Sequence, residues 1–217
     1  MKVVLITGVK NDFDKELAAA FARADFKIYA MANYQIEGVT LLPPEMKEAA
    51  AALQRESGHI DIYIDASDER SPADDFTVRG VLNDKVMREL YDANVTRPMA
   101  LLETFLPLLE SSEGKRLCFL TSAQASINET RGTDGYGYKM AKAALHNFLQ
   151  ITRNVLAPKG FTIRAFDPTL NEVPAEAAAH SALNYFVRRR GVERGDERRD
   201  DEGNLVFRDA FGRQHPW

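Results

Sequence analysis

A tyrosine and a lysine lie four positions apart in Tyr138-Lys139-Met140-Ala141-Lys142, at the start of an alanine-rich run. In a helix this spacing places both side chains on one face. A phenol ordinarily titrates near pH ~10, and a neighbouring ammonium favours the phenolate and lowers that pKa. The pair therefore predicts a tyrosine that gives a proton to a carbonyl oxygen, or takes one from an alcohol.

Two further polar residues precede this pair. Ser122 ends an apolar segment over residues 116–121, and Asn94 lies in an amphipathic run over residues 83–109. A serine hydroxyl at a strand end can hold the carbonyl oxygen on which charge develops during reduction. Each residue also has a purely structural interpretation: a surface pair on a helix, a hydroxyl that completes a strand end, and a polar residue in a helix or turn. All four together favour the chemical interpretation more than any one does.

The elements that must position these residues alternate along the chain. Strand-like apolar segments alternate with helical runs, and the periodicity of each type is distinct. The expected strands cover residues 2–6, 26–31, 38–42, 60–64, 116–121 and 161–166, and the expected helices cover residues 14–21, 45–56, 83–109 and 139–157. This order predicts an α/β fold, a doubly wound parallel sheet of the Rossmann type, with the strands' carboxyl ends at one ligand-binding edge.

The connection between the second and third expected strands is unusually short. Only residues 33–38 separate them, so the helix at this point is missing or reduced to a turn. With 217 residues, 45% hydrophobic and 28% charged, the chain has the composition of an ordinary soluble globular protein. We expect one domain over residues 1–217, with a charged surface loop at 188–203 and a C-terminal tail at 204–217.

These residues resemble the short-chain dehydrogenase/reductase family over roughly residues 2–170. The order matches as well as the content: Thr7-Gly8 follows the first strand, and Asn94, Ser122, Tyr138 and Lys142 come next in the family's sequence of catalytic positions. The gap from serine to tyrosine is slightly longer than usual, and loop residues 128–134 account for the difference. The resemblance implies an NAD(P)-dependent oxidoreductase that interconverts a carbonyl and a secondary alcohol by hydride transfer.

The resemblance also implies a role for each catalytic residue. Tyr138 is the proton donor and acceptor, and Ser122 holds the carbonyl oxygen by a hydrogen bond. Lys142 binds the ribose hydroxyls of the nicotinamide and lowers the pKa of Tyr138. Asn94 holds a relay water where the family's helix bends. The substrate is expected to be a small carbonyl compound or a secondary alcohol.

The cofactor site implied by the resemblance draws on residues from several turns. Besides Tyr138 and Lys142, the residues expected to bind the dinucleotide are Thr7, Gly8, Lys10, Asn11, Phe13, Asn33, Ala66, Ser67, Pro168 and Thr169. The region after the second strand, residues 31–34, is uncharged and does not decide between NAD and NADP. The positive charge of Lys10 favours NADP slightly.

The turn after the first strand departs from the family pattern. Of the family's three turn glycines only Gly8 is kept, because Asp12 and Asp14 stand at the other two positions. A carboxylate ~5 Å from a phosphate charge costs about 3 kcal/mol at an effective dielectric of ~20, and under 1 kcal/mol in water. Asp12 and Asp14 therefore predict weaker cofactor binding, unless they cap the following helix instead of facing the ligand.

Further departures motivate a second hypothesis. The family's Asn-Asn-Ala-Gly becomes Ile64-Asp65-Ala66-Ser67, its acidic residue after the third strand becomes Leu42-Pro43, and its Pro-Gly becomes Pro168-Thr169. All of these positions surround the expected cofactor. The alternative is a catalytically inactive relative that keeps the fold and serves as a binding or regulatory protein with weakened dinucleotide binding.

The charge and hydropathy of the chain limit the kinds of partner and location that we expect. The net charge of −4 offers no basic footprint for nucleic acid. No run approaches the ~20 apolar residues that span a membrane, and the amino terminus lacks a signal-peptide pattern, so we expect a cytoplasmic protein. The histidines have no metal-ligand spacing, so no metal is expected. The single cysteine, Cys118, is predicted to be a buried packing residue.

Two helical stretches predict an interface. Apolar residues recur at helical spacing over residues 98–110 and 138–157, beyond what one sheet contact requires. In the resembling family these helices pair across a twofold axis, which implies a homodimer or homotetramer; a buried core alone is the alternative. The loop and helix over residues 169–187 are expected to fold over the site as a lid that selects the substrate.

Overall fold

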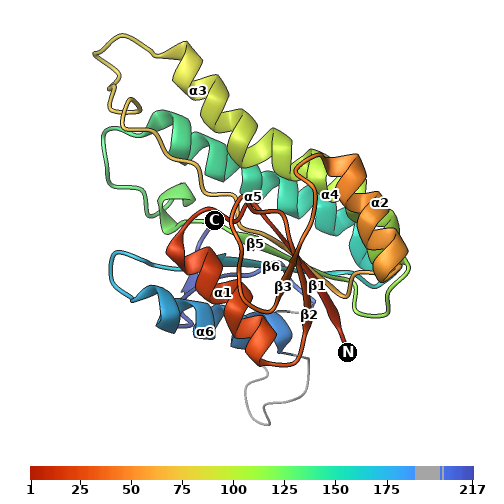
Figure 1. Ribbon diagram of the computed structural model, residues 1–217. Helices are drawn as coiled ribbons and strands as arrows, with labels where there is room; N and C mark the ends of the chain where they lie inside the picture. Colours follow the sequence, from red (N-terminus) through yellow and green to blue (C-terminus); the bar gives the residue numbers. More distant parts are fainter. Residues whose placement is uncertain (189–200, 202) are drawn as a thin grey trace.

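The computed structural model describes residues 1–188, 201 and 203–217, and a twisted sheet lies at its centre (Figure 1). Within these residues eight strands run in the order β3-β2-β1-β4-β5-β6-β7-β8. Their bounds are β1 (Val3–Thr7), β2 (Lys27–Ala30), β3 (Val39–Leu41), β4 (Ile62–Asp65), β5 (Arg116–Leu120), β6 (Thr162–Asp167), β7 (Phe207–Asp209) and β8 (Gln214–His215). All neighbours are parallel except β7 and β8, which are antiparallel.

Helices cover both faces of the sheet (Figure 1). One face carries α1 (Asp12–Arg23) and α6 (Ala175–Val187), and the other carries α2 (Met46–Glu56), α3 (Asp84–Tyr91), α4 (Arg97–Glu110) and α5 (Tyr136–Leu156). A π-helical turn, η1 (Asp92–Thr96), joins α3 to α4, and short 3₁₀ turns lie at Ala123–Ala125 and Ala157–Lys159. The predicted α/β doubly wound fold is confirmed. Among the described residues, no helix is both long enough and apolar enough to cross a membrane.

The sequence of the first strand explains why the sheet lies at the centre of the molecule, between two layers of helices. Val3, Val4, Leu5 and Ile6 are all buried. Successive side chains point to opposite faces, so Val4 and Ile6 join the core beneath α1 and α6, while Val3 and Leu5 join the core beneath α2, α4 and α5. A parallel strand buried on both faces needs a continuous apolar run, which is what the sequence contains.

The short connection after β2 is confirmed as well. Residues 31–38 contain no helix, and the chain returns to β3 directly. Gly38 adopts φ +74°, and a Cβ there would lie 3.1 Å from the Cβ of Ala22. The turn thus packs tightly against the end of α1. An ordinary doubly wound fold has a helix between these two strands, and here this loop takes its place.

The carboxyl end is part of the sheet. The predicted tail contains β7, which lies parallel to β6, and β8, which turns back on β7. Trp217 packs its ring on His146, with centroids 4.7 Å apart, and on Phe207 at 5.9 Å. Most of the charged loop predicted at residues 188–203 lies outside the described residues.

The helix expected to form a lid has a different position. Residues Ala178, Ala179 and Ala182 are buried, and α6 packs beside α1 on one face of the sheet (Figure 1). Its alanines permit this close approach. The lid prediction is therefore wrong for the helix at residues 175–187, and of the predicted segment only residues 169–172 line a cavity near the expected site.

One buried histidine makes a prediction about stability. His146 on α5 lies between aromatic rings, and its Nε2 is 2.5 Å from Thr121 Oγ1. Burial, aided by the charge of Lys142, lowers the pKa of His146 to about 4. The pKa of His146 is lower in the folded protein than its ordinary value of ~6.5. The neutral ring therefore makes its full contribution to the stability of the folded protein above pH ~6.5, and this contribution is lost progressively as the pH falls towards the pKa of the folded state.

We therefore expect wild-type protein to lose about 2 kcal/mol more unfolding free energy between pH 7 and pH 5 than His146→Gln loses. Urea unfolding at both pH values, followed by circular dichroism, measures this difference. The comparison between variants removes the contribution of the other titrating groups. Equal losses in the two proteins would show that His146 titrates normally in the folded state.

Candidate active site

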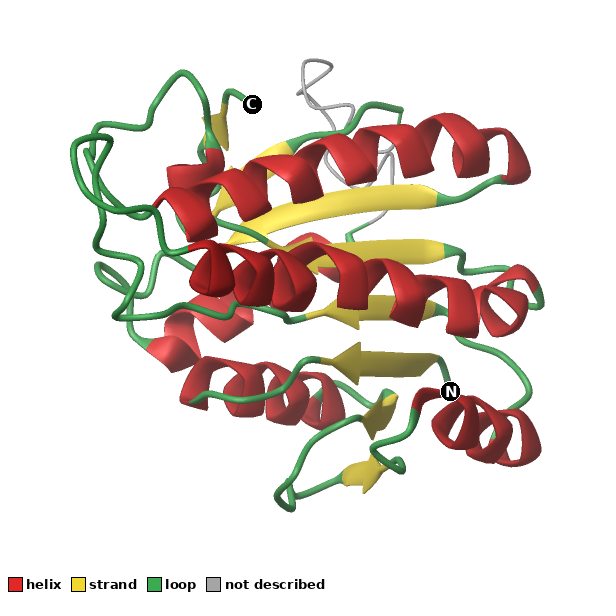
Figure 2. Ribbon diagram, turned by 90° about the horizontal axis from the view of Figure 1, so that it is seen from above, coloured by secondary structure: helices red, strands yellow, loops and turns green. Residues whose placement is uncertain are grey.

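The four predicted catalytic residues come together at the carboxyl edge of the sheet. Figure 2 shows loops gathered beyond the arrowheads of the strands. Ser122 follows β5, Tyr138 and Lys142 lie in the first two turns of α5, and Asn94 lies in η1. All four are buried, and the Lys142 side chain has 0% exposure. The site therefore lies where ligands of open α/β sheets bind.

The start of α5 is held by a residue far away in the chain. The carboxylate of Asp74 accepts hydrogen bonds from the backbone N–H of Gly137 at 2.9 Å and of Tyr138 at 2.8 Å. Helix amino termini leave such N–H groups unpaired, and Asp74 satisfies two of them. A Cβ at Gly137 would come within 2.8 Å of Leu90. Asp74 thus fixes the position of the first turn of α5 and the direction in which the Tyr138 side chain points.

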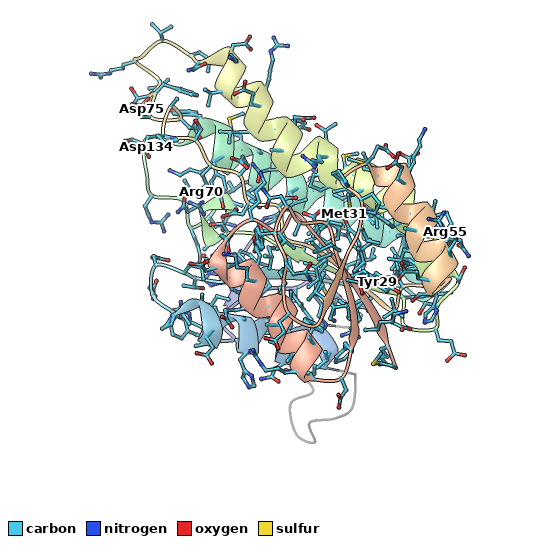
Figure 3. All side chains as sticks on the ribbon, in the orientation of Figure 1. Tyr29, Met31, Arg55, Arg70, Asp75 and Asp134 are labelled. Carbon is cyan, nitrogen blue, oxygen red and sulfur yellow. The ribbon has the colours of Figure 1, made fainter. Side chains whose placement is uncertain are left out.

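The hydroxyl of Tyr138 lies between two charged side chains. It donates a hydrogen bond to Oδ1 of Asp68 at 2.6 Å and accepts one from Nη2 of Arg70 at 2.7 Å. The guanidinium of Arg70 also stacks on the phenol ring, 4.0 Å from its centroid. Asp68 and Arg70 belong to the loop after β4, and Arg70 is labelled in Figure 3.

Lys142 faces the same carboxylate. Its Nζ donates to the backbone carbonyl of Ser67 at 2.5 Å and lies 3.2 Å from Oδ1 of Asp68. That oxygen is therefore shared by the ammonium of Lys142 and the hydroxyl of Tyr138. Although burial raises the pKa of Asp68, the charges of Lys142 and Arg70 bring it below its ordinary value, so the carboxylate is ionised at neutral pH.

This arrangement corrects one expectation. The pKa of Tyr138 is raised well above its ordinary value, first by burial and then by the charge of Asp68, while Arg70 and the Ser122 hydroxyl act in the opposite direction. The predicted lowering of the Tyr138 pKa by Lys142 is wrong for this arrangement, because Asp68 lies against both groups. The phenol becomes more acidic only when that carboxylate moves away.

Asn94 anchors the loop that carries these charges. Its amide donates to the backbone carbonyls of Glu69 and Leu90, both at 2.9 Å, and its Oδ1 accepts from the N–H of Glu69 at 3.1 Å. π-helical turns of this kind often mark functional sites. The resemblance gave Asn94 the task of holding a relay water. What the contacts show is a side chain that holds the backbone between Asp68 and Arg70.

The turn after β1 approaches the neighbouring loop closely. Gly8 adopts φ +76°, and a Cβ there would lie 2.7 Å from the backbone nitrogen of Ser67. Glycine is therefore required at this position. Ser67 is in turn held by Asp65, whose Oδ1 accepts from its N–H at 3.0 Å, while Oδ2 accepts from Thr7 at 3.0 Å. These contacts bring the predicted cofactor residues Thr7, Gly8 and Ser67 together.

Asp14 caps the first helix, as one of the two interpretations predicted. Asn11 accepts from the Asp14 N–H at 3.0 Å, and Oδ2 of Asp14 accepts from the N–H of Asn11 at 3.1 Å, which is a capping box. The same Oδ2 accepts from the N–H of Lys10 at 2.8 Å. Asp12, by contrast, is 88% exposed and pairs with Lys15.

The capping carboxylate uses N–H groups that an anion would otherwise bind. Backbone N–H groups at a helix amino terminus are a ready site for phosphate, and here two of them already point at Asp14. Its other oxygen, Oδ1, is buried and has no hydrogen-bond partner within the part of the chain that the structure describes. Burial, partly offset by the N–H groups of Lys10 and Asn11, raises the pKa of Asp14 to about 6.

Two cavities flank the site. A cavity of about 510 Å³ lies beside the β1 turn, and the predicted residues that line it are Thr7, Gly8, Lys10, Asn33 and Ser67. Arg97, at the start of α4, lines it too. The ammonium of Lys10 pairs with Glu69, which also lines this cavity. This cavity has the position and size for the adenosine end of a dinucleotide.

The second cavity has a volume of about 430 Å³ and lies beside Ser122. It is lined by Ser122, Asp68 and Arg70, and by the predicted residues Pro168 and Thr169. The remaining predicted cofactor residues line neither cavity: Tyr138 and Lys142 are buried near the start of α5, Asn11 caps α1, and Phe13 and Ala66 are buried in the core beneath α1 and α6. The prediction missed Asp68, Arg70 and Asp74. Their only signal was a charged stretch directly after the fourth strand.

The sheet order and the polar residues at its carboxyl edge define a Rossmann-type α/β protein. Three solved structures match over nearly the whole chain. A putative short-chain alcohol dehydrogenase from Burkholderia multivorans has a TM-score of 0.80 at 18% identity, covering 100% of this chain and 99% of that one. Carbonyl reductase Sniffer of D. melanogaster has a TM-score of 0.79 at 13% identity, covering 100% of both chains. A carbonyl reductase from Pseudomonas aeruginosa in complex with NADP has a TM-score of 0.78 at 19% identity, covering 100% of both chains.

The protein has the fold of the short-chain dehydrogenases/reductases, as its motifs predicted. No family model matches the sequence. An uncharacterized oxidoreductase of Saccharomyces cerevisiae is 32% identical over 78 residues, which is 36% of this chain and 30% of the yeast protein. The match to this curated relative thus spans less than a third of its length.

Proposed function

We propose that this protein is an NAD(P)-dependent oxidoreductase that interconverts a carbonyl and a secondary alcohol. The observation that carries the proposal is that Ser122, Tyr138 and Lys142 are buried together at the carboxyl edge of the sheet, where the Ser122 hydroxyl acts on the pKa of Tyr138 and the Lys142 ammonium lies 5.9 Å from the centre of the Tyr138 ring. Hydroxyl donors prearranged around one point are most effective where charge develops in a transition state. A carbonyl oxygen that becomes an alkoxide is such a point.

Each side chain has a defined task in the proposed reaction. Tyr138 gives its proton to the carbonyl oxygen, and Ser122 donates a hydrogen bond to the same oxygen. Lys142 holds the ribose hydroxyls of the nicotinamide and, once Asp68 has moved away, favours the phenolate. When bound, the nicotinamide supplies the hydride to the carbonyl carbon. The product is the alcohol, and the phenolate regains its proton from solvent.

The residues present fit a dinucleotide at both of its ends. The cavity beside Gly8 would hold the adenosine end, and Lys142 and Tyr138 would hold the nicotinamide ribose. The carboxylate of Asp14, which accepts from N–H groups of the turn after β1, would oppose a pyrophosphate bound at this turn and weaken binding while it is charged. The positive charge of Arg97 at this cavity favours NADP slightly over NAD, whereas the charge of Lys10 is paired with Glu69.

Titration of the protein with NADPH and with NADH, followed by nicotinamide fluorescence, tests the proposal. We expect saturable binding, tighter for NADPH, and oxidation of the bound cofactor on addition of members of a small carbonyl panel. Absorbance at the reduced nicotinamide band measures that turnover. If neither nucleotide binds at millimolar concentration, the oxidoreductase proposal is refuted.

The second candidate, a non-catalytic binding or regulatory protein, has a specific observation in its favour. Two internal carboxylates, those of Asp14 and Asp68, hold the N–H groups and the Tyr138–Lys142 pair that a cofactor needs. In a protein that binds no dinucleotide, these two carboxylates compete with no ligand, so both can stay in place. The titration above separates the two candidates, because only the oxidoreductase requires that the nucleotide displace both carboxylates.

We further infer a homodimer through α4 and α5. Apolar side chains on these helices are exposed, among them Ile151 at 58% and Val155 at 60%, and they border a shallow hollow of about 680 Å³. Exposed apolar patches of this kind mark interaction sites. A twofold axis that pairs the same helices buries this surface in an isologous contact.

Val155→Glu is expected to convert the dimer to a monomer, because it places a charge in the centre of the apolar contact. Size-exclusion chromatography with light scattering measures the mass. Val81→Glu is the matched control, since Val81 is 91% exposed and lies in a loop away from these helices. A wild-type protein that is monomeric at high micromolar concentration would contradict the inferred dimer.

A further inference from the structure

A carboxylate is already bound at the reacting end of the site, and it belongs to the protein. Asp68 accepts from the hydroxyl of Tyr138, lies 3.2 Å from the ammonium of Lys142, and pairs with the guanidinium of Arg70, Nε to Oδ2, at 3.3 Å. A phenol, an ammonium and a guanidinium thus converge on one anion. The chemistry of this cluster is that of a carboxylate receptor.

Cofactor binding changes the partners of this cluster. In the proposed function, Lys142 holds the nicotinamide ribose, so Asp68 must leave the ammonium and the phenol. Arg70 then loses its nearest anion. Its guanidinium remains stacked on the ring of Tyr138 at 4.0 Å and faces the 430 Å³ cavity that Ser122 also lines. A guanidinium that has lost its contact with Asp68 and lies beside the reacting carbonyl favours a substrate that brings its own negative charge.

We propose that the substrate is a short oxo acid whose carboxylate is bound by Arg70, while Tyr138 and Ser122 hold its carbonyl oxygen. This proposal rests on the proposed function. Arg70 Nη2 lies 2.7 Å from the Tyr138 hydroxyl, so the two groups reach oxygens on adjacent or next-adjacent carbons, as in a 2-oxo or 3-oxo acid. The reaction remains the balanced one above: hydride goes to the carbonyl carbon, the Tyr138 proton goes to its oxygen, and the carboxylate is unchanged.

The acidic residues that line the same cavity limit the number of negative charges on the substrate. Asp167 and Glu172 line it, as does Asp209, whose carboxylate is paired with Arg213 and His215. This part of the cavity is therefore acidic or neutralised and offers no second anion site. We expect a monocarboxylate to be preferred over a dicarboxylate of the same length.

Calorimetric titration with oxamate, an unreactive analogue of a 2-oxo acid, tests the carboxylate site without requiring turnover. Methyl oxamate, in which the charge is removed, is the comparison ligand. In Asp68→Asn, where the competing charge is absent, oxamate is expected to bind at least tenfold more tightly than its ester. Wild-type protein should show the same preference with weaker binding, because Asp68 competes.

Arg70→Leu is expected to remove the preference for oxamate, with a loss of about 10- to 100-fold, since a hydrogen bond to a charged group disappears. Arg70→Lys should restore part of it, because the charge returns without the planar fork. Arg79→Leu is the matched control, as Arg79 is exposed and does not line this cavity. Both variants of Arg70 should fold, because its side chain is 51% exposed.

Turnover of pyruvate and methyl pyruvate with NADPH completes the test. If the acid has the higher kcat/KM and Arg70→Leu reverses that order, the substrate class is supported. If the ester is reduced as well as the acid, or oxamate binds no better than methyl oxamate, the carboxylate site is overturned while the oxidoreductase function stands. If no carbonyl is reduced but oxamate binding depends on Arg70, the redox function fails and the carboxylate site remains.

Discussion

Tyr138→Phe is expected to lower kcat/KM for carbonyl reduction by about 10²- to 10⁴-fold, the usual contribution of a positioned general acid. The substitution removes the hydroxyl that lies 2.6 Å from Asp68 and 2.7 Å from Arg70, and it keeps the ring on which Arg70 stacks. The dissociation constant for NADPH should change by about tenfold at most, because the substitution removes a single hydroxyl from the cofactor site. Steady-state kinetics and fluorescence titration measure the two quantities separately.

Tyr136→Phe is the matched control for this prediction. Tyr136 lies two positions earlier on α5, and its ring stacks on Phe76 at 5.7 Å, away from the charged cluster. Loss of its hydroxyl should leave kcat/KM nearly unchanged. Full turnover by Tyr138→Phe would remove Tyr138 from the role of proton donor, and equal losses in both variants would point to a disturbed helix instead.

Asp14→Asn is expected to tighten dinucleotide binding by about 10- to 100-fold at pH 8, since a charge ~5 Å from a phosphate costs up to about 3 kcal/mol. The amide oxygen can still accept an N–H from the turn, so the cap is partly kept. In wild-type protein the pKa of Asp14 is raised to about 6. The carboxylate is charged above that pH and neutral below it, so the affinity should rise as the pH falls from 8 to 5.

The pH series is best made with NADH, which lacks the 2′-phosphate and its own titration. Wild-type protein should bind NADH more tightly at pH 5 than at pH 8, and Asp14→Asn should show a nearly flat profile. Asp12→Asn removes the same charge from the same turn, but that side chain is 88% exposed and already paired. We expect it to change the affinity by less than about threefold because solvent screens an exposed charge. Equal effects of the two substitutions would mean that Asp14 does not face the pyrophosphate.

Asp14 and Asp68 each occupy a position in the site where an anion of a ligand could bind. Each carboxylate accepts from donors of the site: the backbone N–H groups of the turn for Asp14, and for Asp68 the ammonium of Lys142, which also donates to the backbone carbonyl of Ser67. Buried donors without partners are costly, so the resting arrangement is stabilised. A bound dinucleotide would replace the contacts of Asp14 with its pyrophosphate, and the substrate carboxylate would take the place of Asp68 at Arg70.

Local pattern was sufficient for the layout of the molecule. The run Val3 to Ile6 is apolar on both faces, which in a chain of alternating strands and helices specifies an inner parallel strand. The gap between β2 and β3 is too short for a helix whatever its sequence. The four-residue spacing of Tyr138 and Lys142 places them on one helix face. They are buried beside Ser122 because β5 ends just before Ser122, at the edge of the sheet where α5 begins.

Other features depended on contacts between distant segments. Asp68 and Arg70 meet Tyr138 although about 70 positions separate them, and Asp74 caps a helix that begins much later in the chain. Alanine-rich α6 has the same local pattern whether it covers the site or the sheet. Only packing beside α1 decided that it belongs to the core and not to a lid.

The amino-acid sequence by itself determined the first six strands, the helices between them, the Rossmann fold class and the identity of the candidate proton donor, but not β7 and β8. Periodicity and spacing act over a few residues, and that range is enough for these features. The tertiary structure alone decided which charges surround the phenol, and with them the direction of its pKa shift. A pKa depends on burial and on charges within a few ångströms, and those neighbours come from loops that only the folded chain brings together.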